Sequence, residues 1–142
     1  MKKLYIFLLL AGIACISTTY AQNNDLFINA LRNCTPYNSS GELMLNGVST
    51  TTTKQMQGWN DNKCTYKETV LFNGNSLTIT CRFSKSQIRD IVSVADEYYA
   101  THKNAAEEVD TSSLEAIQNN PIASVFNKYL QNPEVCTMGG IE

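Results

Sequence analysis

Regular alternation of apolar and polar side chains predicts β-structure in the middle of the chain. The clearest strand covers residues 77–83, and its inward side is entirely apolar: Leu77, Ile79, Cys81 and Phe83. The preceding strand, residues 64–72, alternates in the same way, except that the charged Glu68 falls on its inward side. Asn73 and Gly74 lie between the two and are typical of a two-residue turn, so we expect an antiparallel hairpin.

Upstream of this hairpin the β pattern is weaker. A short apolar piece at residues 43–45 is followed by Asn46-Gly47, a strong hairpin signal, and then by residues 48–57, which alternate weakly. The run from Thr50 to Thr53 is typical of an exposed or edge strand, and we interpret it as β propensity rather than as a binding surface. Residues 37–41 are expected to be a polar turn.

Helical periodicity flanks the β region, and Ser84 with Gln87 forms a capping box at the start of the longest helix. Helices are expected over residues 25–34, about 85–103, 112–117 and about 121–130. This order predicts an α+β fold: an N-terminal helix, a three- to four-stranded antiparallel meander, and two to three C-terminal helices packed on one face. Consecutive strands argue against a doubly wound nucleotide-binding fold, in which strands and helices alternate.

The chain begins with the pattern of a secretory signal peptide. Two lysines precede an apolar run that is too short to span a bilayer, and Ala21 is the small residue at the expected cleavage site. We therefore interpret residues 1–21 as a signal peptide and residues 22–142 as one disulfide-stapled domain, periplasmic or secreted, with no transmembrane span after cleavage. Lipidation of Cys15 is the weaker alternative, because Gly12 stands where lipoprotein signals usually carry a branched residue.

Cleavage changes the charge of the chain. The full sequence has 11 basic and 13 acidic side chains, and the loss of Lys2 and Lys3 leaves a net charge of −4. Binding to nucleic acid requires a surplus of Lys and Arg to neutralise phosphates. We therefore expect no nucleic-acid partner and no anionic membrane surface as the main partner.

The remaining cysteines are Cys34, Cys64, Cys81 and Cys136. An even number in an exported chain predicts two disulfides, with three possible pairings. Neither a C-x-x-C motif nor the close ligand pairs of a zinc site is present, so we expect no metal and no redox role. In the expected hairpin the two strand cysteines are not directly opposite each other, which disfavours a Cys64–Cys81 bridge. Each is expected to join Cys34 or Cys136.

Catalytic motifs are scarce in this sequence. His102, the only histidine, falls near the end of an expected exposed helix, without a serine nucleophile motif or a glycine-rich phosphate loop. We therefore expect a non-enzymatic protein without a cofactor, and an enzyme that uses His102 is the remote alternative. The residues expected to contact a partner are Trp59, in a polar turn, and Lys67 and Arg82, on the outer face of the sheet.

Four short motifs carry a resemblance to other proteins: Cys34-Thr35-Pro36-Tyr37, Gly58-Trp59, Lys63-Cys64-Thr65-Tyr66 and Thr80-Cys81-Arg82-Phe83-Ser84. Over about residues 30–90 they resemble small exported proteins of gut-type Gram-negative bacteria, a group without a known activity. The resemblance implies a periplasmic α-β-β-β-α domain held by disulfides, and it implies no functional residues. We expect a domain that binds an unidentified protein or envelope component. An inhibitor or immunity protein against a toxin or hydrolase is the alternative.

Overall fold

The computed structural model describes residues 21–45, 48–101 and 119–140. In chain order its elements are α2 (Ala21–Asn33), β1 (Tyr37–Leu45), β2 (Val48–Asn60), β3 (Lys63–Phe72), β4 (Asn75–Phe83), α3 (Lys85–Thr101), α5 (Pro121–Leu130) and β5 (Cys136–Gly139). The expected helix at residues 112–117 lies outside the described residues. The expected signal peptide also lies outside them, except that its last residue, Ala21, is the first residue of α2.

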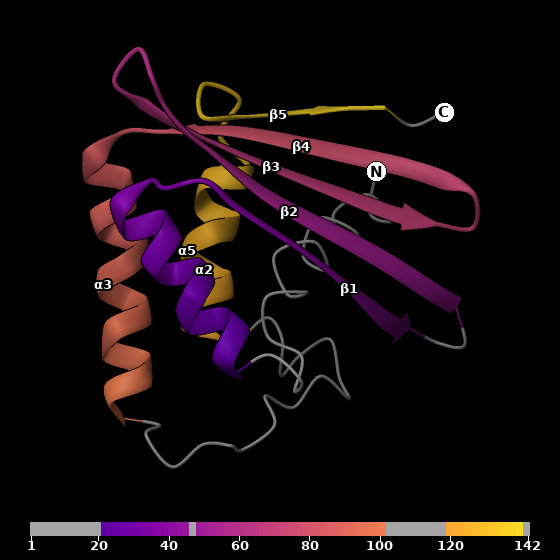
Figure 1. The fold of residues 1–142 in the computed structure, drawn as a ribbon, viewed down its shortest axis with the longest axis horizontal. Helices are drawn as coiled ribbons and strands as arrows, with labels where there is room; N and C mark the ends of the chain where they lie inside the picture. Colours follow the sequence, from indigo (N-terminus) through magenta and orange to yellow (C-terminus); the bar gives the residue numbers. More distant parts are fainter. Residues whose placement is uncertain (1–20, 46–47, 102–118, 141–142) are drawn as a thin grey trace.

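The strands form one antiparallel sheet in the order β1-β2-β3-β4-β5. Two-residue turns join β2 to β3 at Asp61 and Asn62, and β3 to β4 at Asn73 and Gly74, and all four residues have the positive φ that such turns require. Strand β5 reaches the sheet after two helices and pairs with β4. Figure 1 shows α2, α3 and α5 on the same side of the sheet, so no described helix covers the other face.

The predicted architecture is wrong in its sheet and in its C-terminal end. The sheet has five strands rather than three or four, and the chain continues past the last helix into a strand. Strand β5 has only four residues, of which Cys136 alone is buried, so its own sequence shows no alternation. Its conformation is set by hydrogen bonding to β4, which is a tertiary interaction. The expected polar turn at residues 37–41 is the first half of β1, an edge strand that tolerates polar residues.

Aromatic rings join the helices to the sheet. Phe27 of α2, Tyr66 of β3, Phe83 of β4 and Phe126 of α5 pack with ring centroids 5.6 to 6.4 Å apart. Helix α3 adds a buried stripe to this core: Ile88, Ile91, Val92 and Ala95. Each large apolar side chain that leaves water in this way contributes roughly 1.5–3 kcal/mol, so this two-layer core determines where the helices lie.

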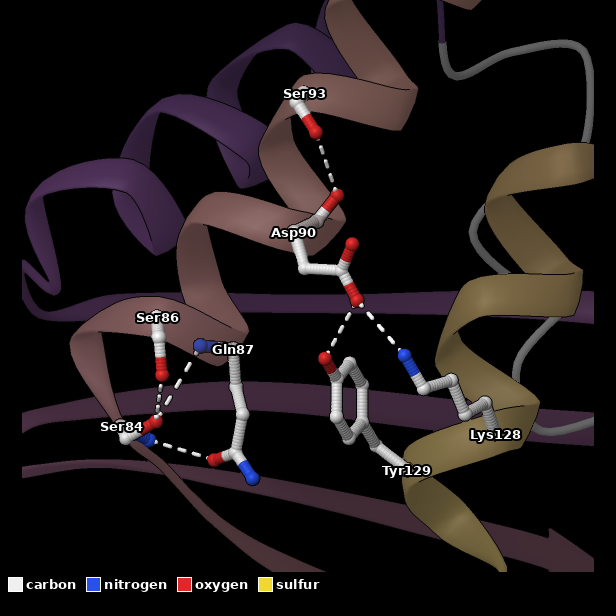
Figure 2. Close-up of polar contacts among 7 residues, drawn as sticks. All are labelled: Ser84, Ser86, Gln87, Asp90, Ser93, Lys128 and Tyr129. Carbon is white, nitrogen blue, oxygen red and sulfur yellow. Dashed lines mark hydrogen bonds and ion pairs between the residues drawn. The ribbon is translucent and has the colours of Figure 1, made fainter.

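Polar contacts hold the N-terminal half of α3 in place (Figure 2). The backbone N–H of Ser84 donates to Gln87 Oε1 at 2.7 Å, and the N–H of Gln87 donates to Ser84 Oγ at 3.3 Å, which confirms the predicted capping box. One carboxylate oxygen of Asp90 accepts hydrogen bonds from Tyr129 Oη at 2.6 Å and from Lys128 Nζ at 3.1 Å. These bonds, that from Tyr129 above all, lower the pKa of Asp90 and tie α3 to α5.

The helix-facing side of the sheet also buries two opposite charges. Glu68 of β3 is 2 % exposed and lies across from Lys54 of β2, which is 6 % exposed. Tyr66 donates from its hydroxyl to Glu68 Oε2 at 2.6 Å, whereas Glu68 Oε1 has no hydrogen-bond partner among the described residues. Lys54 Nζ lies 5.4 Å from the ring centroid of Phe27. Burial raises the pKa of Glu68, and the attraction of Lys54 and the bond from Tyr66 offset part of that rise.

This raised pKa predicts a pH dependence of stability. Between the ordinary glutamate pKa of 4.5 and the raised pKa, the native state binds more protons at Glu68 than the unfolded state does. The contribution of Glu68 to the free energy of unfolding should therefore fall as the pH rises through this window, by at most about 1.4 kcal/mol per pH unit.

Urea unfolding of the native protein and of Glu68→Gln at a series of pH values measures this contribution. The variant keeps an acceptor for Tyr66 but does not titrate. The free energy of unfolding of the native protein, minus that of the variant, should decrease as the pH is raised above 4.5. A difference that increases with pH would show that Glu68 is stabilised as a carboxylate in the folded protein.

Candidate functional site

A groove lies where the C-terminal end of α2 and the first turns of α3 meet the end of β2. Its volume is about 520 Å³. The lining residues are Arg32, Asn33, Trp59, Lys85, Ile88, Arg89 and Val92. The groove thus combines three cationic side chains, one large aromatic ring and two aliphatic side chains, a composition that suits contact with a partner.

A β-bulge places Trp59 in this groove. The pairing of β2 with β3 shifts between Met56 and Gly58, and after the shift Trp59 lies opposite Cys64. Cys64 is on the helix-facing side of the sheet, so Trp59 is on that side as well, three positions after the inward-facing Met56. Gly58 makes the shift possible because its φ is 97°, a value that side chains rarely allow.

The Cys34–Cys64 disulfide joins the two walls of the groove, which are the C-terminal end of α2 and the end of β2 with Trp59. Cys34 directly follows the last residue of α2, and the bond holds it to β3 with a Cα–Cα distance of 5.8 Å. Its partner Cys64 is the residue opposite Trp59. The end of α2, which carries Arg32 and Asn33, is therefore fixed next to the Trp59 ring by a covalent bond.

The electrostatics of the groove are positive on balance. Lys85 Nζ lies 5.7 Å from the ring centroid of Trp59, a cation–π contact. The guanidinium of Arg32 donates to both carboxylate oxygens of Asp96, at 2.6 and 3.0 Å, and this pairing lowers the pKa of Asp96. Neither Lys85 nor Arg89 forms an ion pair with a described residue. Two of the three cations are therefore available to an anionic group in the groove.

The other two predicted contact residues, Lys67 and Arg82, lie on the opposite face of the sheet. Lys67 is paired in register with Gln55 of β2 and with Thr80 of β4, so its neighbours on this face carry amide and hydroxyl groups. Arg82 is engaged at the turn after β2, where it donates to the carbonyl oxygen of Asn60 at 3.3 Å and lies 3.8 Å from Asp61. The structure therefore does not bring Trp59 together with Lys67 and Arg82.

Sequence reasoning missed the basic residues that do lie near Trp59. Lys85 and Arg89 are spaced by one helical turn from each other, and this spacing was visible within the predicted long helix. The spacing did not say which element would face them. The prediction that Trp59 lies in a polar turn is wrong, because β2 continues to Asn60 and includes both Gly58 and Trp59. Gly58 was the available signal, since glycine in a strand often marks a bulge.

Each predicted hairpin cysteine has its partner outside the hairpin. The disulfides are Cys34–Cys64 and Cys81–Cys136, so the expectation that Cys64 and Cys81 do not bridge each other is confirmed. The second disulfide joins β4 to β5, whose cysteines are paired in register. Two disulfides within one chain are typical of proteins that fold in an oxidising compartment.

Residues 21–45, 48–101 and 119–140 contain neither a cluster of metal ligands nor a membrane-spanning helix. Within these ranges no three His, Cys, Asp or Glu side chains are grouped so that they could hold a metal ion. The same part of the chain has no helix that is both long and apolar enough to cross a membrane. His102 lies outside the described residues.

No protein-family model, no curated protein and no solved structure matches this chain. The groove is therefore the feature of this chain that bears on its function.

The role of the Cys34–Cys64 bond can be tested with a matched pair of double variants. Replacing both cysteines of either disulfide with alanine should lower the free energy of unfolding by about 3–4 kcal/mol, because the bonds close loops with sequence separations of 30 and 55 residues. Only loss of Cys34–Cys64 should separate the walls of the groove and expose Trp59 further.

Trp59 is the only tryptophan, so its emission spectrum reports the state of the groove directly. The emission maximum should move to longer wavelength in the variant that lacks Cys34–Cys64 and stay in place in the variant that lacks Cys81–Cys136. An equal shift in both variants would contradict the assignment of the first disulfide to the groove.

Proposed function

We propose that this chain is an exported, non-enzymatic binding domain and that the groove around Trp59 is its contact site. The observation that carries the proposal is the position of Trp59. Its side chain is 42 % exposed in a groove whose floor is formed by the buried residues Ile88 and Val92. Tryptophan and arginine are the residues most often found at energetic centres of interfaces, and the groove presents both.

The rigidity of the groove supports the same proposal. Its walls are fixed by a disulfide and by the Arg32–Asp96 ion pair, and α3 is held by its capping box and by Asp90. A site whose shape is fixed before binding loses little conformational entropy when a partner binds. This is a property expected of a recognition surface.

The compartment proposed for this function is the periplasm or the extracellular space. The two disulfides favour an oxidising environment, and the first 21 residues have the composition of a signal peptide. The partner would then be a protein of the same compartment or a component of the cell envelope.

Quantitative capture from the envelope fraction of the producing cell tests the proposal. The immobilised, oxidised native protein should retain a partner that Trp59→Ala retains at least about 30-fold more weakly, the loss typical of an interface centre. Leu71→Ala is the matched control, because Leu71 is exposed to a similar extent, 46 %, but lies on the far face of the sheet. Capture of nothing by the native protein, or equal loss in both variants, would contradict the proposal.

A further inference from the structure

We infer that the occupant of the groove is an acidic protein segment, in which carboxylates flank an apolar side chain. The inference rests on the proposed binding function and adds the chemistry of the partner. It is carried by the arrangement of charges around the apolar floor of the groove.

The available cations are separate from each other. Lys85 and Arg89 are four residues apart on α3, which places them about 6 Å apart along the helix axis. Each carries one positive charge, and neither is paired with a described acidic residue. Two unpaired positive charges one helical turn apart can each pair with a carboxylate of an acidic chain.

Apolar side chains also line the groove. Ile88 and Val92 are almost fully buried and line the groove together with Trp59 from the end of β2. An aliphatic or aromatic side chain of the partner can be desolvated there, which a phosphate or sulfate ion cannot exploit. The floor therefore selects for a ligand that carries apolar groups as well as negative charge.

Arg32, at the end of α2, shows that this side of the groove accommodates a carboxylate. Its guanidinium already holds the carboxylate of Asp96 through two hydrogen bonds, so its bidentate donor pair is occupied within the protein. Arg89 has the remaining Arg fork among the described lining residues, and such a fork can pair with a carboxylate, as Arg32 does with Asp96, or with a phosphate. The apolar part of the groove, rather than the cations, therefore favours an acidic protein segment over a phosphate ion.

The experiment follows the emission of Trp59 during titration of the oxidised protein with a short peptide that carries glutamates next to leucine residues. An otherwise identical peptide with glutamine in place of glutamate is the control ligand, and inorganic phosphate is the control anion. We expect the acidic peptide to bind and to change the emission of Trp59. The glutamine peptide should bind about tenfold more weakly, because two partly exposed charge pairs are lost.

Protein variants identify the charges that the peptide contacts. Lys85→Gln combined with Arg89→Gln should weaken binding of the acidic peptide about tenfold and should leave binding of the glutamine peptide unchanged. Lys67→Gln, on the far face of the sheet, should have no effect. Raising the salt concentration from about 0.1 to 1 M should weaken binding to the native protein and have little effect on the doubly substituted variant.

Three results would overturn the inference. The first is equal affinity for the acidic and the glutamine peptide, and the second is competition by phosphate at concentrations similar to those of the peptide. The third is capture of an envelope partner that depends on Trp59 but not on Lys85 and Arg89, and in that case the proposed binding function would stand. Failure to capture any envelope partner, combined with acidic-peptide binding at the groove, would instead count against the proposed function alone.

Discussion

The covalent bond between Cys34 and Cys64 is the constraint on which the site depends. It joins the end of α2 to β3, and so it links the helical layer to the sheet at the point where the groove opens. Because Cys64 lies opposite Trp59, the same bond sets the distance between the aromatic ring and the wall formed by Arg32 and Asn33. The second disulfide acts elsewhere, where it holds the four-residue β5 on the edge of β4.

The hydrophobic pattern was sufficient for the parts of the fold in which local sequence and tertiary structure agree. The β3–β4 hairpin, the capping box of α3 and the last helix, α5 (Pro121–Leu130), form as predicted. Strand β5 and the first half of β1 could not be predicted, because their pairing partners, rather than their own side chains, make them strands. Predictions from periodicity fail where a segment is ordered mainly by hydrogen bonds to a distant one.

The site was only partly predictable for a related reason. Trp59 could be singled out because it is a large aromatic residue. The face of the sheet on which it lies depends on the one-residue bulge at Gly58, because a shift by one residue moves a side chain to the other face. The sequence therefore suggested Lys67 and Arg82 as its companions, whereas the structure brings it next to Lys85.

The buried Glu68 did stand out in the sequence, as the charged residue on an otherwise apolar strand face. The structure shows that Lys54 and Tyr66 accompany it in the core.

A nitrogen–proton correlation spectrum of the oxidised protein, recorded with and without the acidic peptide, tests whether the groove is the binding site. Trp59 is the only tryptophan, so a single indole signal reports on the groove. We expect this signal to move together with the backbone signals of residues 85–92, and the signals of residues 65–71 to stay in place. Shifts centred on residues 65–71, with an unchanged indole signal, would contradict the claim that the groove is the binding site.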